Sequence, residues 1–175
     1  ATECHSMGSV RLLDALAGSD EEPGRFRTLL RRHLSKLKIP AMADPTDLAG
    51  FVATGGNIEA LSKLAGMPVD DKGVSIVPLA RLKAIAESLF SLSYRERIQR
   101  LGLREDRADV VLPAAMVYIR IAEMIGVDEV IVPHTGIKEG VLFDLVDEVS
   151  GRNSLPAARE REITDNCVAL GRKFF

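Results

Sequence analysis

Apolar residues recur every three to four positions along much of the chain, a spacing that places them on one face of a helix. In residues 26–37 they alternate with basic side chains, and we expect Pro40 to end that helix. The same spacing predicts further helices over residues 58–64, 77–91, 94–101, 110–126, 138–149 and 157–175. Pro78 and Pro113 are expected in first helical turns, where proline is tolerated.

Short apolar runs lie between the predicted helices and are typical of strands. Residues 47–53 and 128–133 are such runs, and residues 1–13 are predicted to form a strand and turn. Strands that alternate with helices indicate an α/β fold with a mainly parallel sheet. These strands are few for a self-sufficient sheet, so we expect part of the sheet to lie upstream.

Composition limits the class of protein. The chain has 175 residues, of which 46% are hydrophobic and 27% are charged, as in one soluble globular domain. A net charge of −2 argues against nucleic-acid binding through bulk charge, and no apolar run is long enough to span a membrane. Cys4 and Cys167 lie far apart without metal-ligand spacing, so we predict a reduced, cytoplasmic setting. The chain begins without Met and ends inside a predicted helix, so it is expected to be part of a longer protein.

A glycine pair follows the strand predicted over residues 47–53, in the sequence Thr54-Gly55-Gly56-Asn57. Glycines let the backbone come within hydrogen-bonding distance of a phosphate, and the N–H groups at a helix start favour an anion. We expect Gly56 to need a positive φ and the space that a side chain would fill. The structural alternative is a tight turn with Asn57 as the N-cap residue.

Two further segments contain side chains that could contact a ligand. Arg107, in a charged stretch before the long helix 110–126, could offer a bidentate fork to phosphate oxygens. The alternative for Arg107 is an ion pair with Asp106 or Asp109. His134 follows the strand predicted over residues 128–133, where ligands sit in open α/β sheets, although a lone histidine there is more often a loop residue. We find no Ser/His/Asp order, metal-ligand cluster, Walker loop or dinucleotide fingerprint.

Together, segments of this chain resemble one family, and they occur in the family's order. The segments are Ser6-Met7-Gly8-Ser9-Val10-Arg11-Leu12, Ala53-Thr54-Gly55-Gly56-Asn57, Arg107-Ala108-Asp109-Val110-Val111-Leu112-Pro113 and Gly136-Ile137-Lys138-Glu139-Gly140-Val141-Leu142. The chain is similar to the exopolyphosphatase and guanosine pentaphosphate phosphohydrolase group of the actin, Hsp70 and sugar-kinase superfamily. The resemblance covers roughly residues 6–145.

The resemblance implies a ribonuclease-H-like, actin-type lobe whose mostly parallel sheet is flanked by helices. Residues 1–150 would be the second lobe of a two-lobe protein without its first strands. Residues 151–175 would be a hinge and a helix that leads toward a C-terminal helical domain. The family also implies Mg²⁺ as a cofactor and a catalytic base on the first lobe, so we expect no catalytic residue here.

The leading hypothesis is therefore part of a phosphohydrolase that removes the terminal phosphate of polyphosphate or the 5′ γ-phosphate of guanosine pentaphosphate. Thr54, Gly55, Gly56, Asn57 and Arg107 would bind phosphate. The alternative is a non-catalytic phosphate- or nucleotide-binding module, or a lobe of an actin-like ATPase or sugar kinase. The expected partners are the polyphosphate substrate and the first lobe, with neither nucleic acid nor membrane. The sequence leaves a homodimer open.

Overall fold

The computed structural model of the protein describes residues 23–38 and 50–151. The strand predicted over residues 1–13, the start of the strand 47–53 and the helix 157–175 lie outside these ranges. The chain divides into two compact units, Ala1–His134 and Thr135–Phe175.

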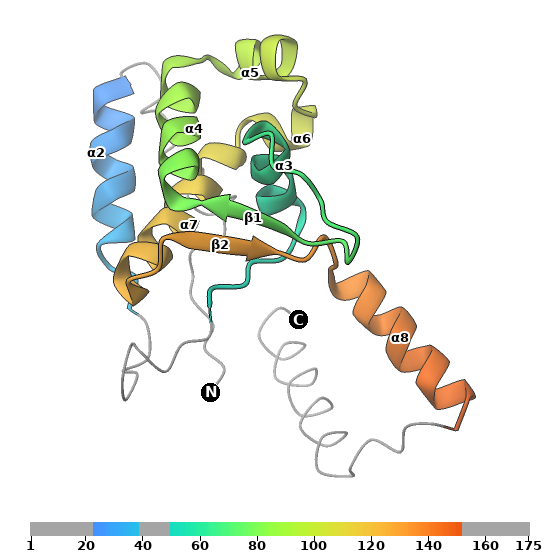
Figure 1. Ribbon diagram of the computed structural model, residues 1–175. Coiled ribbons are helices and arrows are strands. Elements are labelled where there is room, and N and C mark those ends of the chain that lie inside the picture. The colour runs from blue at the N-terminus through green and yellow to red at the C-terminus, as the bar shows by residue number, and fades with distance from the viewer. Residues whose placement is uncertain (1–22, 39–49, 152–175) are drawn as a thin grey trace, which may run out of the picture. The chain divides into compact units, whose positions relative to one another are not determined.

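The described elements are mostly helices, with the short strands β1 and β2 among them (Figure 1). In chain order they are α2 (Pro23–Leu34), α3 (Gly56–Leu64), β1 (Ser75–Pro78), α4 (Leu79–Ser91), α5 (Tyr94–Leu101), α6 (Glu105–Ala108), α7 (Val111–Ile125), β2 (Glu129–Val132) and α8 (Ile137–Val149). The predicted helices are all present within these ranges, with ends that differ by at most three residues. The short helix α6 was not predicted.

The described sheet is mixed. β1 pairs antiparallel with β2, with Ser75 opposite Val132. On the other side of β2, Val52 forms a parallel bridge with Ile131. The N–H of Ile131 donates to the carbonyl of Phe51 at 2.8 Å, and its carbonyl accepts from the N–H of Ala53 at 2.9 Å. Residues 51–53 and β2, both predicted as strands, therefore run side by side in the same direction.

The prediction of a helix from residue 77 was wrong, because residues 75–78 form β1. Pro78 is the last residue of this strand and the N-cap of α4, with extended backbone angles (φ −60°, ψ 136°). Leu79, which follows, donates its N–H to the carbonyl of Asp128 at 2.7 Å. The sequence hid β1 because four residues are too few to show a strand period and proline is common at a helix start.

α2 ends at Leu34, several residues before Pro40. The hydroxyl of Ser35 donates to the carbonyl of Arg32 at 2.8 Å, and the next backbone N–H groups bond three residues back instead of four. A side chain that bonds the backbone competes with the helix, and the tighter turn closes it. The hydrogen bond of the Ser35 side chain, rather than Pro40, therefore ends α2.

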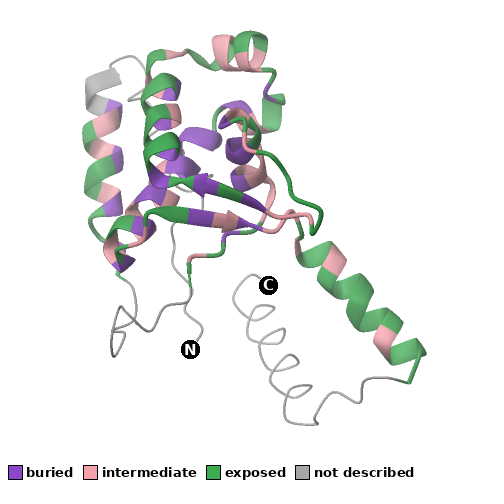
Figure 2. Cartoon of the chain, in the orientation of Figure 1, coloured by how far each residue is buried: buried purple, intermediate pink, exposed green. Residues whose placement is uncertain are grey.

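α7 is the central helix of the first unit, in contact with α2, α3, α4 and α6. Its first five residues, Val111 to Ala115, are buried, including Pro113 in the first turn as predicted. Ala115 and Ala122 are fully buried where neighbouring helices approach. Buried residues gather where these helices face each other and on one face of the sheet (Figure 2). Leucines from the neighbouring helices complete this core, and each fully buried one contributes about 1.5–3 kcal/mol.

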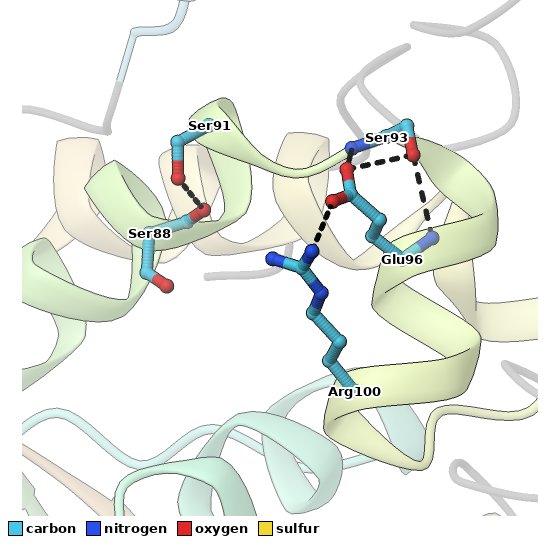
Figure 3. Close-up of polar contacts among 5 residues, drawn as sticks. All are labelled: Ser88, Ser91, Ser93, Glu96 and Arg100. Carbon is cyan, nitrogen blue, oxygen red and sulfur yellow. Dashed lines mark hydrogen bonds and ion pairs between the residues drawn. The ribbon is translucent and has the colours of Figure 1, made fainter.

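A side-chain cap starts α5 at the corner after α4 (Figure 3). The hydroxyl of Ser93 accepts from the N–H of Glu96, and the carboxylate of Glu96 accepts from the N–H of Ser93 at 3.0 Å. This reciprocal pair is a capping box. Hydrogen bonds from the backbone and hydroxyl of Ser93, together with the charge of Arg100, hold the pKa of Glu96 below its ordinary value.

α8 belongs to the second unit, and its described residues are exposed or intermediate. The carboxylate of Glu139 accepts from the N–H of Gly136 at 2.8 Å, and this bond lowers the pKa of Glu139. Within residues 23–38 and 50–151, no helix has the length and apolar character that crossing a membrane requires.

Candidate phosphate-binding site

The carboxyl ends of residues 51–53 and of β2 lie at the same edge of the sheet, because these segments run parallel. Thr54–Asn57 follow the first segment, and Pro133 and His134 follow the second. Ligands of open α/β sheets bind beyond this edge. The glycine-containing turn predicted to bind phosphate therefore stands where the fold favours a ligand.

Gly55, not Gly56, has the positive φ that only glycine adopts easily. Its φ is 103° and its ψ 161°, and it is the N-cap of α3 with no side-chain cap. The expectation of a positive φ at Gly56 was wrong, because Gly56 is the first residue of the helix. Asn57 is not the N-cap either, since it lies inside the first turn. The first N–H groups of a helix have no acceptor within it, so this uncapped start favours an anion.

Gly56 has a different role, which is to make room for a guanidinium group. A Cβ atom at this position would lie 2.6 Å from Nη2 of Arg107 and 2.9 Å from its Cζ. Nη1 of Arg107 donates to Oδ1 of Asn57 at 2.9 Å. The structure thus brings Gly56, Asn57 and Arg107 together, although Arg107 is 50 residues away from Asn57 in the chain.

The contacts of Arg107 fit both interpretations of its role, phosphate binding and an ion pair with an aspartate. Its Nε lies 3.5 Å from Oδ2 of Asp106, but Oδ1 of Asp106 also accepts from Arg104 at 3.0 Å. The side chain of Arg107 remains 34% exposed. Because an exposed pair of this length contributes little energy, the guanidinium can contact a ligand without losing much.

Arg97 fixes the backbone that carries Arg107. From α5, its Nη1 donates to the carbonyl of Ala108 at 2.9 Å, and its Nε and Nη2 donate to the carbonyl of Leu89 at 3.2 and 2.9 Å. Ala108 is itself fully buried. Arg97 therefore joins the end of α4 to α6, a role that the sequence did not reveal because Arg97 resembles any basic residue on a helix surface.

Tyr118 and Glu59 are two further residues that sequence reasoning missed. Burial raises the pKa of Tyr118 on α7, the charge of Arg107 opposes the shift, and the charge of Glu59 adds to it. The phenol therefore stays protonated at neutral pH, so it can donate a hydrogen bond as well as accept one. The spacing of α7 places Tyr118 on its apolar stripe, which gave no functional signal.

Comparisons with known proteins agree with this arrangement. The model of the Ppx/GppA phosphatase family matches residues 2–149. The chain belongs to this family. No curated protein sequence gives a significant match.

Solved structures of Ppx/GppA relatives share the fold. A crystal structure of the Aquifex aeolicus Ppx/GppA phosphatase is 26% identical, covers 79% of this chain and 47% of its own, and has a TM-score of 0.60. An exopolyphosphatase from Cytophaga hutchinsonii is 19% identical over 83% of this chain and 49% of its own, with a TM-score of 0.60. An exopolyphosphatase-like protein is 16% identical over 82% of this chain and 49% of its own, with a TM-score of 0.67. The latter two show the fold alone.

The predicted fold class is confirmed: the protein is an α/β, actin-type lobe of the Ppx/GppA family. It spans about half the length of the solved structures that it matches. The boundary predicted between residues 150 and 151 stays a prediction, and so do the roles of Thr54, Gly55, Gly56, Asn57 and Arg107.

In this Ppx/GppA chain, His134 is bonded to Ser75 rather than turned to the glycine turn. Nε2 of His134 lies 2.8 Å from Oγ of Ser75, and that hydroxyl donates to the carbonyl of Pro68 at 3.0 Å. A hydroxyl has one proton, so Nε2 of His134 must donate to Ser75. Ser75 is 1% exposed, so this pair is not an activated nucleophile.

The Mg²⁺ implied by the resemblance finds no dedicated ligand set in the part of the chain that the structure describes. No group of three His, Cys, Asp or Glu side chains able to hold an ion occurs there. Asp106, the carboxylate nearest Arg107 in sequence, is paired with arginines. We therefore assign no metal ligand to these residues.

Proposed function

We propose that this chain is the second lobe of a phosphohydrolase that removes the terminal phosphate of inorganic polyphosphate or the 5′ γ-phosphate of guanosine pentaphosphate. Thr54, Gly55, Gly56, Asn57 and Arg107 bind phosphate oxygens. The observation that carries the proposal is the guanidinium of Arg107, which lies against the uncapped start of α3 at the carboxyl edge of the sheet. Family membership and the similarity to the Aquifex aeolicus Ppx/GppA phosphatase support the class of reaction.

The chemistry uses positioning and charge neutralisation. A water oxygen attacks the terminal phosphorus, the bond to the bridging oxygen breaks, and orthophosphate leaves with a chain shorter by one unit. The N–H groups and dipole at the start of α3 hold the equatorial oxygens. Arg107 offsets the charge that develops on the transferred group. The base that accepts the proton of water is assigned to the first lobe, and Mg²⁺, when bound, would neutralise phosphate charge.

Asn57 and Tyr118 support this site without reacting. The amide oxygen of Asn57 holds Nη1 of Arg107 and thereby orients the guanidinium plane. Tyr118 stays protonated at neutral pH, so it adds no negative charge near Arg107. The soluble, cytoplasmic setting stays a prediction.

The test measures phosphate release by the two-lobe protein and by this 175-residue chain alone. We expect the two-lobe protein to release phosphate from polyphosphate or guanosine pentaphosphate faster than from ATP. The chain alone is expected to be inactive, because the base is on the other lobe. Robust turnover by the chain alone would contradict the assignment of the base. Preference for ATP would favour the actin-like ATPase reading, and binding without turnover by the two-lobe protein would favour a non-catalytic module.

A further inference from the structure

A cavity lined partly by basic side chains lies among α2, α4 and α7, which stand side by side in Figure 1, away from the glycine turn. Its volume is about 470 Å³, within the range of small-molecule sites. Its polar and apolar lining includes Arg31, Lys83, Met116, Ile119, Arg120 and Glu123. Neither the Thr54–Asn57 turn nor Arg107 contributes to it.

The carboxylates of this cavity are already neutralised. Nζ of Lys83 lies 2.7 Å from Oε1 of Glu123. Glu87, also in the lining, pairs with Arg27, whose guanidinium stacks on the ring of Phe90 at 4.2 Å. The acidic residues therefore do not compensate the other basic side chains of the cavity.

Two guanidinium groups remain, one on α2 and one on α7. Nε of Arg120 is buried and has no hydrogen-bond partner among the described residues. The side chain of Arg31 likewise has no ion pair or hydrogen bond within residues 23–38 and 50–151. A buried guanidinium donor without an acceptor is rare in proteins, and a bound anion would satisfy it.

We propose that this cavity binds a small phosphate monoester with an apolar body. A monoester phosphate carries close to two negative charges at neutral pH, which matches two uncompensated guanidinium groups. Leu34, Ala86, Met116 and Ile119 supply apolar walls for the body of the ligand. Inorganic phosphate would meet the charge but leave these walls in contact with water, so it would bind more weakly.

Phenyl phosphate is the probe, and the methyl group of Met116 is the reporter. The chain has five methionines, so ¹³C-methyl spectra are simple, and a Met116→Leu variant assigns the signal. We expect phenyl phosphate to shift the Met116 methyl resonance saturably, with inorganic phosphate and benzoate each binding more weakly. Absence of a saturable shift up to about 10 mM would overturn the proposal.

Substitution of the two arginines distinguishes a specific binding site from nonspecific electrostatic attraction of phenyl phosphate. Arg31→Gln and Arg120→Gln should each weaken phenyl phosphate binding at Met116 by about tenfold or more. Arg81→Gln, on the same helix as Lys83 but outside the cavity lining, is the matched control and should have no effect. Equal affinity in Arg31→Gln, which alters an exposed side chain and leaves folding intact, would overturn the proposal even if Arg120→Gln failed to fold.

The site is also separable from the proposed phosphohydrolase site. Arg107→Gln should leave the Met116 titration unchanged, while it removes any response at the amide of Gly56. If Arg107→Gln abolished the Met116 response, the cavity would not be an independent site and the proposal would fail. The function proposed for the glycine turn would be untouched by that outcome.

Discussion

Two helix starts in the same domain are built in opposite ways. At α5, the hydroxyl of Ser93 and the carboxylate of Glu96 cap the helix reciprocally, with Arg100 2.9 Å from that carboxylate (Figure 3). At α3, the N-cap is Gly55, which has no side chain, and the guanidinium of Arg107 comes from a distant part of the chain. The first start is capped by its own local sequence, whereas we propose that the second binds an anion.

Both helices carry an acidic residue in the first turn, Glu96 in α5 and Glu59 in α3, but only Glu96 caps the backbone. The difference lies in the cap and in the cation, because the guanidinium of Arg107 lies against the uncapped start of α3. A cation there adds to the positive end of the helix dipole, and an anion would offset it. A capped start is therefore a stability feature, and a glycine-capped start beside an arginine is a functional candidate. The substitutions below test this contrast.

The largest effect is expected from Gly56→Val in the two-lobe protein. Its side chain would displace the guanidinium of Arg107 and fill the approach to the backbone, since even a Cβ would lie 2.6 Å from Nη2. We expect kcat/KM to fall by about 100-fold or more. The fold should survive, because the atoms displaced are the end of a flexible side chain.

A double variant provides the control for Gly56→Val. If the valine acts through Arg107, adding it to Arg107→Gln should cost little more than Arg107→Gln alone. Full additivity of the two changes would show that the glycine acts independently of the arginine.

Arg107→Lys should produce the next largest effect. Lysine keeps the charge but loses the planar fork, which costs about 1–3 kcal/mol of transition-state stabilisation. This corresponds to a fall in kcat/KM of roughly 5- to 150-fold. Arg104→Lys is the matched control, because Arg104 is an exposed neighbour whose side chain, among the described residues, pairs only with Asp106. Unchanged kinetics in Arg107→Lys would remove Arg107 from the site.

Arg97→Ala should lower the stability of the fold, and not only the activity. It removes the donors that hold the carbonyls of Leu89 and Ala108, so we expect a loss of about 2 kcal/mol in the free energy of unfolding. Arg95→Ala, on the same helix and exposed, should change stability by less than about 0.5 kcal/mol. Chemical denaturation of both variants measures the difference, and equal stability would show that Arg97 does not brace α6.

The smallest effect is expected at the start of α5. Ser93→Ala should cost about 1 kcal/mol of stability by removing the cap and should leave phosphate binding unchanged. The pKa of Glu96 is lowered in the folded state, so its contribution is present above its ordinary value of about 4.5 and is lost as pH falls through the lower folded value. The difference between wild type and Ser93→Ala should therefore shrink in acid. A difference that is constant from pH 7 to acid would contradict the capping role of Glu96.

The sequence predicted most helices because their apolar stripes are long, as in α4 and α7. It predicted the turn at Thr54–Asn57, because a glycine pair after a strand is visible locally. It placed the positive φ at Gly56 instead of Gly55, because φ depends on where the helix begins. It could not show that Arg107 meets Gly56, since that contact is made between α6 and α3. Arg97 and Tyr118 were missed for the same reason, because tertiary contacts alone distinguish them from ordinary helix residues.

Titration of the ¹⁵N-labelled chain with tripolyphosphate tests the central claim most directly, with the amides of Gly56 and Glu96 observed in the same spectra. These amides lie in the first turns of α3 and α5. We predict a saturable shift of the Gly56 amide, no shift at Glu96, and loss of the Gly56 response in Arg107→Gln. Equal responses at the two helix starts, or a Gly56 response that persists in Arg107→Gln, would contradict the assignment of this turn as a phosphate site.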